Sequence, residues 1–175
     1  MLSAINHEVL LSVYSLADSS GLASGISIFF AEWFPFLVLA SVIVTVFLKE
    51  ENEGEVFRVL VRTAFPTFVV WIIVVLIKHF YPSPRPFAEL ELTPLISVSD
   101  PFGSFPSAHA AVFGSIAGTM LVYRIRVARW YILSAILIAI GRVAVGVHWP
   151  GDVLTGILLG LAVGFAIAKL LLRKT

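Results

Sequence analysis

Long apolar runs separated by short polar segments constrain this chain more than any other feature of its sequence. A helix needs about 20 mainly apolar residues to cross the hydrocarbon core of a bilayer. Runs of roughly this kind cover residues 26–48, 56–77, 108–123, 129–146 and 152–172. Only 13% of the residues are charged, whereas a soluble domain carries about a quarter. The sequence therefore predicts an all-α, polytopic membrane helix bundle with five transmembrane helices, forming one domain over residues 1–175.

The N-terminal segment has a different pattern from the five runs. Residues 3–17 are shorter, and their apolar positions recur at roughly helical spacing. This pattern favours an interfacial amphipathic helix lying on the bilayer surface, and a sixth span is the alternative.

The remaining composition narrows the classes of partner and site. A net charge of +1 gives no reason to expect a nucleic-acid partner, and the absence of cysteine excludes disulfides and thiolate metal sites. Gly156, Gly160 and Gly164 recur at the spacing of a helix-packing face, which we interpret as packing within the chain rather than dimerisation. The oligomeric state stays open.

Lysine and arginine in short loops predict the orientation in the membrane. Basic residues gather in the segment 123–129, in the C-terminal tail and around the first hairpin: Arg124, Arg126, Arg129, Lys169, Arg173, Lys174, Lys49, Arg58 and Arg62. In a five-span topology these regions share one side, which is expected to be cytoplasmic. The segments 78–107 and 147–151 then face the extracytoplasmic side of the cell (inner) membrane.

Several cationic side chains converge on that outer side. Arg142 lies inside the fourth run, where an arginine costs about 2.5–3.5 kcal/mol on insertion scales. Taken alone, it fits equally well as a structural arginine paired with a buried carboxylate or with carbonyls. Lys78 ends the second run, Arg85 follows seven residues later, and His109 opens the third run. Together they indicate a bound anion, and phosphate suits guanidinium and ammonium donors better than a carboxylate.

The long segment 78–107 ends at a further set of donors for an anion. Ser107 and the backbone amides that open the third run form a helix N-terminus, which binds phosphate readily. A loop of this length in a compact protein is usually functional.

Two histidines indicate chemistry in addition to binding. His148 and Asp152 are four residues apart, so a helical turn between them lets the carboxylate orient the imidazole as a nucleophile. The alternative is that Asp152 only caps the fifth helix. His109 is then available as a general acid. A metal site is disfavoured, because no HExxH motif and no carboxylate cluster accompany these histidines.

These segments carry a resemblance to a known family. "KHFYPSPRP", "PSAH" and "GRVAVGVHWPGD" resemble the three signature segments of the type 2 phosphatidic acid phosphatase superfamily, which also includes soluble vanadium haloperoxidases. Ala108 stands where the family pattern has glycine, and Gly141 stands where it has serine. The hydrophobicity of the chain favours the membrane lipid phosphatases of that superfamily.

The resemblance implies a role for each matching residue. His148 would be the nucleophile that forms a phosphohistidine, Asp152 would orient it, and His109 would be the acid. The phosphoryl oxygens would be held by Lys78, Arg85, Ser107, the amide at Ala108, and Arg142. No metal and no other cofactor is implied. Gly141 lacks the hydroxyl of the family's serine, which leaves open how many donors surround the substrate.

Two further segments indicate a substrate class. The opening "INHEVLLSVYSLAD" and the "RPF" segment are similar to bacterial undecaprenyl-diphosphate phosphatases of the bacitracin-resistance type. The expected reaction converts undecaprenyl diphosphate to undecaprenyl phosphate at the bilayer. The alternative lipid substrates are phosphatidylglycerophosphate, phosphatidic acid and lipid A 1-phosphate. An alternative of another class is a non-catalytic transporter that binds a phospholipid, which explains the cations but not the His–Asp pair.

Residues 87–105 are expected to govern head-group selectivity, because the motifs do not reach them. Four apolar residues of this segment are expected to border the bilayer and to let a lipid reach the site sideways: Phe87, Leu90, Leu92 and Leu95.

Overall fold

The computed structural model describes residues 2–48, 52–123 and 125–173. All regular elements in these ranges are helical. They are α1 (Leu2–Asp18), α2 (Gly21–Ile28), the π-helical turn η1 (Phe29–Trp33), α3 (Phe34–Phe47), α4 (Glu53–Phe80), α5 (Pro86–Glu89), α6 (Ala108–Tyr123), α7 (Ile125–Ala144) and α8 (Pro150–Leu172). The predicted all-α membrane bundle is confirmed.

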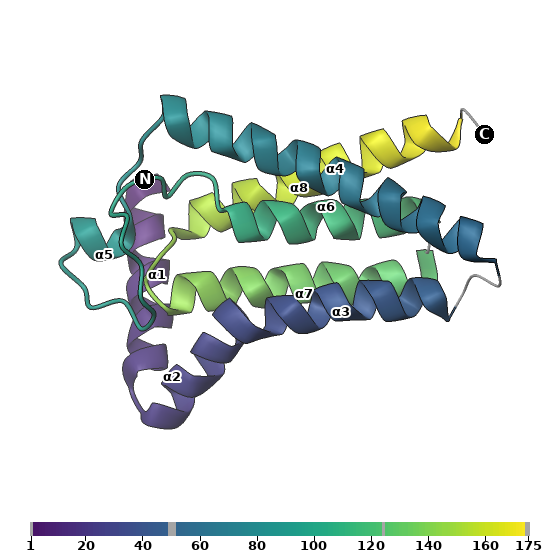
Figure 1. The fold of residues 1–175 in the computed structure, drawn as a ribbon. Helices are drawn as coiled ribbons and strands as arrows, with labels where there is room; N and C mark the ends of the chain where they lie inside the picture. Colours follow the sequence, from purple (N-terminus) through teal and green to yellow (C-terminus); the bar gives the residue numbers. More distant parts are fainter. Residues whose placement is uncertain (1, 49–51, 124, 174–175) are drawn as a thin grey trace.

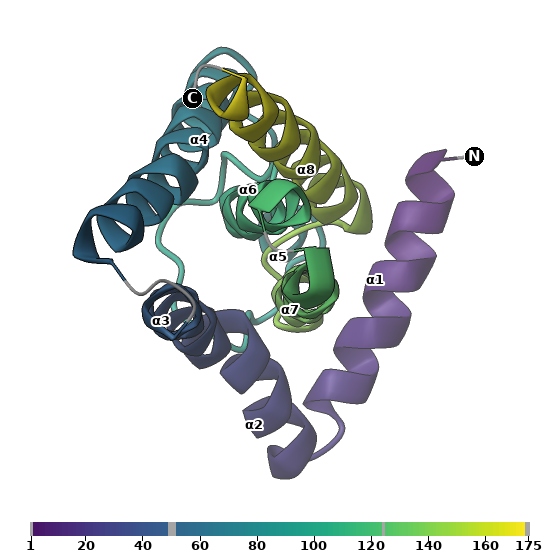
Figure 2. The same cartoon turned by 90° about the vertical axis from the view of Figure 1, so that its right-hand side faces the viewer.

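Helices α3, α4, α6, α7 and α8 run side by side along the bundle (Figure 1). Figure 2 shows α6 at the centre, with α3, α4, α7 and α8 arranged around it. Helix α6 has 16 residues, which corresponds to about 24 Å at 1.5 Å per residue and is shorter than a typical hydrocarbon core. Most of α6 is buried by its neighbours. Because those neighbours shield it, α6 does not need a lipid-facing surface of full length.

The other four predicted spans are long and apolar enough to cross a membrane. They extend over Gly21–Phe47, Gly54–Phe80, Arg126–Ala144 and Pro150–Leu172. The first begins five residues earlier than the hydropathy of the sequence indicates, because α2 and η1 continue without a break into α3. Among the basic residues used for the orientation, Lys49, Arg124 and Lys174 lie outside the described residues.

Helix α1 lies across one end of the bundle rather than alongside the spans (Figure 1). Leu10 on α1 is fully buried against a cluster that includes Val143 and Trp149. The Tyr14 hydroxyl donates to the Thr93 carbonyl at 2.7 Å, and the Asn6 side chain accepts from the Gly151 amide at 3.0 Å. This arrangement agrees with the predicted interfacial helix.

The tightest helix pair is α6 with α8, and glycines make it possible. A Cβ added at Gly156 would approach the Ser107 carbonyl oxygen to 2.7 Å, and Cβ atoms at Gly160 and Gly164 would collide with the backbone at Ala111 and Ser115. The prediction that these glycines serve packing within the chain is confirmed. The close approach also brings the N-terminal ends of α6 and α8 together, and these ends carry His109 and Asp152.

Candidate active site

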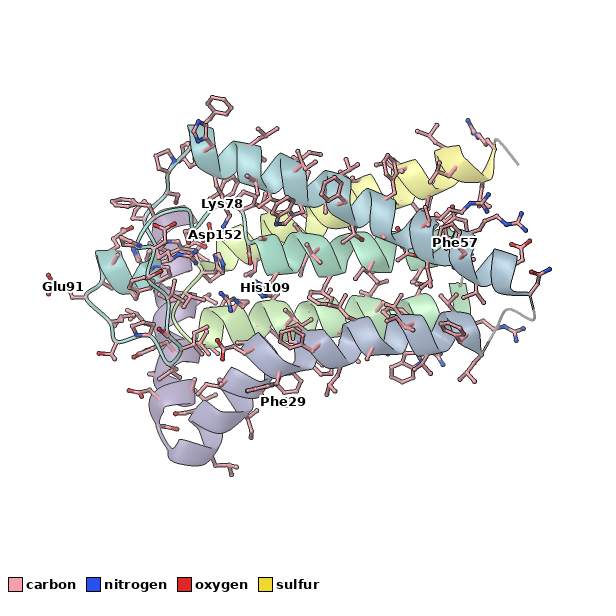
Figure 3. The ribbon with its side chains drawn as sticks, viewed as in Figure 1. Phe29, Phe57, Lys78, Glu91, His109 and Asp152 are labelled. Carbon is pink, nitrogen blue, oxygen red and sulfur yellow. The ribbon has the colours of Figure 1, made fainter. Side chains whose placement is uncertain are left out.

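The motif residues meet at the end of the bundle that carries α1 and α5. Lys78 lies in the last turn of α4, His109 in the first turn of α6, and Arg142 in the last turn of α7. Asp152 lies in the first turn of α8. Figure 3 shows Lys78, His109 and Asp152 at this same end of the molecule. The helices thus bring together residues that are up to 74 positions apart in the sequence.

The turn between α7 and α8 positions His148. Gly146 has φ +80, a left-handed conformation that glycine adopts without a steric penalty, and it reverses the chain after α7. Trp149 then caps α8, and Asp152 accepts a hydrogen bond from the Trp149 amide at 2.9 Å. Asp152 therefore caps the fifth predicted helix, α8, but capping is not its only contact. Its Oδ2 also lies 3.7 Å from His148 Nδ1. One carboxylate serves both purposes.

The surroundings of His148 define which ring nitrogen can react. Its Nε2 lies 3.4 Å from Nη1 of Arg85. A guanidinium has only donors, so Nε2 is the acceptor and the ring proton sits on Nδ1, toward Asp152. Burial lowers the pKa of the His148 imidazole well below its usual range, the Asp152 carboxylate raises it, and nearby cations led by Arg142 lower it. His148 is therefore neutral at physiological pH, with the Nε2 lone pair pointing into the cationic site.

Arg85 is held by the loops on both sides of the site. Its Nε donates to the Asp100 carbonyl at 2.9 Å, and its Nη1 donates to the Val147 carbonyl at 3.0 Å. Burial lowers its pKa, and the Asp100 carboxylate raises it. These bonds leave Nη2 without a partner among the described residues, so a rigidly placed donor remains for an anion.

Two further cations have donors to spare. Lys78 Nζ donates to the Gly103 carbonyl at 2.5 Å, which uses one of its three hydrogens. Arg142 is 7% exposed, and its Nε forms no hydrogen bond with any residue that the structure describes. An unsatisfied guanidinium at this depth is costly unless a ligand completes it. Lys78, Arg85 and Arg142 all act electrostatically on both His109 and His148.

Ser107 contributes differently from the expectation. Its backbone amide donates to the Asp152 carbonyl oxygen at 3.1 Å, so that amide is not free for phosphate. Its hydroxyl is buried and has no partner within the described chain, so the side chain is the available donor. Ala108 is the first residue of α6, and the first amides of a helix have no acceptor within it.

His109 lines a cavity next to η1. The cavity has a volume of about 410 Å³, and Arg142, Glu32 and Ser97 also line it. A smaller cavity of about 260 Å³ shares His109 and Glu32 and reaches Trp71. His109 and Arg142 therefore share one cavity, which is open to a ligand.

A protein-family model matches the part of the chain that holds these residues. The model of the PAP2 superfamily matches residues 56–175, which hold all the motif residues. The chain belongs to the PAP2 superfamily. With its apolar spans, it is an integral membrane protein of that superfamily.

Individual relatives match over most of the chain. YbjG of Escherichia coli (strain K12) is 29% identical over 164 residues, covering 92% of this chain and 80% of YbjG. The undecaprenyl-diphosphatase BcrC of Bacillus subtilis (strain 168) is 26% identical over 163 residues, covering 92% of this chain and 81% of BcrC. The crystal structure of LpxE from Aquifex aeolicus superimposes with a TM-score of 0.76 at 25% identity, covering 94% of this chain and 95% of LpxE.

Sequence reasoning missed one polar residue of this PAP2 site. Ser104 is fully buried, and its hydroxyl donates to Asp152 Oδ2 at 2.5 Å. Together with the Trp149 amide it orients the carboxylate that lies 3.7 Å from His148 Nδ1. Ser104 lies 48 residues from Asp152 and three before Ser107, and the only available signal was its place just before the "PSAH" segment.

The departure from the family pattern at Gly141 has a structural cause. A Cβ at this position would lie 2.8 Å from the Ala31 amide nitrogen and 2.9 Å from the Phe30 carbonyl carbon. The backbone of η1 therefore occupies the space that a serine side chain would need. Glu32, the next residue of η1, enters the site from this direction.

The four apolar residues of the segment 87–105 that are expected to border the bilayer also contact the rest of the protein. Phe87 and Leu95 pack against the cluster around Val145 and Val147, and Leu90 and Leu92 pack against the cluster around Leu10 and Trp149. All four side chains are partly buried by these contacts. An apolar groove of about 630 Å³ lies between α3 and α4, over α6.

Proposed function

We propose that this PAP2 protein hydrolyses a lipid diphosphate or phosphomonoester through a phosphohistidine intermediate. One observation carries the proposal most directly. His148 is neutral and buried, presents Nε2 to Arg85, and has Asp152 beside its other nitrogen. A buried imidazole with this tautomer is a competent nucleophile for phosphorus.

In the first step, His148 Nε2 attacks the phosphorus, and the bond from phosphorus to the leaving oxygen breaks. Arg85, Arg142 and Lys78 stabilise the equatorial oxygens, with Ser107 and the first amides of α6 as additional donors. The bound phosphate anion offsets the nearby cations and favours the protonated form of His109, which gives its proton to the leaving oxygen. Asp152 stabilises the positive imidazole ring of His148.

In the second step, water attacks the phosphorus of the phosphohistidine. His109, now deprotonated, accepts the proton of that water. The phosphorus–nitrogen bond breaks, inorganic phosphate forms, and His148 returns to its neutral state. The cationic side chains neutralise the developing charge in both steps, so we propose that the reaction requires no divalent metal ion.

The apolar groove between α3 and α4 suits the hydrocarbon part of a lipid. Leu39, Trp71 and Val112 line both this groove and the smaller cavity beside His109. A chain lying in the groove from the bilayer would thus bring its phosphate to His109 and Arg142. A long polyprenyl or acyl chain gains free energy from this apolar surface in proportion to the area that it buries.

Undecaprenyl diphosphate is the substrate that we propose. Support comes from BcrC of Bacillus subtilis, whose name is undecaprenyl-diphosphatase, and from the motif similarity. Conversion to undecaprenyl phosphate would return a carrier lipid for cell wall biogenesis.

The decisive assay compares phosphate release from four lipids by the detergent-solubilised protein. Undecaprenyl diphosphate is expected to give a kcat/KM at least about tenfold above phosphatidylglycerophosphate, phosphatidic acid and lipid A 1-phosphate. Activity is expected to survive excess EDTA, and vanadate should inhibit it as a mimic of five-coordinate phosphorus. Binding without any phosphate release would favour the non-catalytic transporter, and a loss in EDTA that magnesium restores would contradict the metal-independent mechanism.

We also propose that the active site faces the extracytoplasmic side of the cell membrane. Arg126, Arg129 and Arg173 gather at the opposite end of the bundle, where positive charge favours the cytoplasm. Single cysteines test this orientation, because the chain has none of its own. Ser99→Cys, on an exposed loop at the site end, should react with an impermeant maleimide in intact cells or spheroplasts. Leu48→Cys, 81% exposed at the far end of α3, should react only after lysis. The opposite labelling pattern would reverse the topology.

A further inference from the structure

Glu32 is a carboxylate inside a membrane-spanning segment that the mechanism does not use. It lies on η1 within the continuous span Gly21–Phe47. Acidic residues within such segments are rare and usually functional, and π-helical turns occur frequently at functional sites. Ala31 is the buried residue of this turn, and Glu32 beside it is exposed and lines a cavity that also contains His109 and Arg142.

Two observations place Glu32 beside the anion-binding groups. It lines both cavities that His109 lines, and the larger of them also contains Arg142. Because the Glu32 carboxylate and the Arg142 guanidinium have opposite charges and line one cavity, they attract each other. It is the only carboxylate among the lining residues of these two cavities.

The docking of η1 keeps Glu32 in this place. Ala31 is fully buried in the cluster with Val145 and Val147, and the backbone of η1 lies directly against Gly141. Gly141 directly precedes Arg142, so the contact between η1 and α7 lies next to the arginine that shares a cavity with Glu32. The packing of η1 therefore fixes the backbone position from which the Glu32 side chain extends.

We propose that Glu32 is a specificity-determining residue that competes with the bound phosphoryl group for Arg142 and weakens the binding of the most highly charged anions. This inference rests on the proposed phosphoryl site. In the empty site Glu32 balances the charge of Arg142, which reduces the cost of a guanidinium at this depth. In the occupied site the like charges of carboxylate and phosphate repel each other, which favours release of inorganic phosphate.

The test measures vanadate binding to the purified protein by calorimetry, without turnover. Glu32→Gln keeps the size of the side chain and removes its charge, so vanadate should bind roughly three- to tenfold more tightly. Raising the salt concentration should shrink the difference from the unmodified protein, because ions screen a partly exposed charge. A purely structural role of Glu32 would not produce this salt dependence. Among substrates, the diphosphate lipid should gain more in affinity than a monophosphate lipid.

Two variants serve as controls. Glu8→Gln removes an exposed carboxylate on α1 that lines neither of these two cavities, and it should leave vanadate binding unchanged. Glu32→Asp keeps the charge and should stay within about twofold of the unmodified protein; if Glu32→Gln does not fold, tighter binding by Glu32→Ala gives the same test. Unchanged or weaker vanadate binding by Glu32→Gln would overturn the inference about Glu32 but not the proposed phosphoryl site. No vanadate binding by any variant, including the unmodified protein, would overturn the phosphoryl site as well.

Discussion

Replacing His148 by alanine is expected to abolish phosphate release, with a fall in kcat of roughly 10⁴-fold or more. The Nε2 lone pair beside Arg85 is the nucleophile of the proposed first step, and alanine offers no substitute. Rapid quenching with a radiolabelled phosphate substrate should trap an acid-labile phosphoenzyme in the unmodified protein and none in His148→Ala. The variant should still bind vanadate, because Arg85, Arg142 and Lys78 remain.

The matched control for this substitution is His79→Ala. His79 is exposed at the end of α4, next to Lys78, and its ring contacts Phe80 rather than a polar group of the site. This variant should retain nearly full activity and form the phosphoenzyme normally. Phosphoenzyme in His148→Ala would mean that another residue is the nucleophile, and His109 would then be the first alternative to test.

Gly160→Ala is expected to destabilise the bundle more than any other single methyl group added on α8. The new Cβ would collide with the Ala111 carbonyl and lie 2.7 Å from the Ser115 amide nitrogen, and both groups belong to the α6 backbone. Backbone atoms cannot move aside individually, so α6 and α8 must separate. Overpacking of this kind costs about 1–3 kcal/mol, which corresponds to a fall in Tm of roughly 2–12 °C.

Gly25→Ala provides the comparison at a helical glycine in open space. A Cβ at Gly25 would meet no atom within 4 Å, so the substitution removes only the conformational freedom of glycine. The Tm of this variant, measured in detergent, should be unchanged or slightly higher. Activity should fall in Gly160→Ala even at temperatures where it remains folded, because separating α6 from α8 moves His109 away from Asp152. Equal Tm values for the two variants would contradict the packing explanation.

Hydropathy located the long apolar helices well, but it did not reveal the contacts that depend on how these helices and loops pack. Hydropathy indicated the segment 26–48, but the first span begins at Gly21, because small and polar residues in α2 hide the helix. The apolar residues of 87–105 were assigned to the bilayer, because hydropathy does not distinguish a lipid contact from a protein contact. Their contacts with the clusters that include Val147 and Trp149 arise only when the chain folds, because those residues lie about 50 or more positions further along the sequence.

The sequence by itself determined the number of apolar runs, the membrane environment and the identities of the motif residues at the phosphoryl site. These properties follow from local composition and covalent spacing, because a span needs length and a His–Asp pair needs one helical turn. Only the tertiary structure decided which groups surround those residues. Ser104 reaches Asp152, the Ser107 amide is occupied, and η1 brings Glu32 toward Arg142 because four helices and a loop meet at one end of the bundle. Such contacts depend on how closely helices approach, and that distance is set by glycines whose partners lie on other helices.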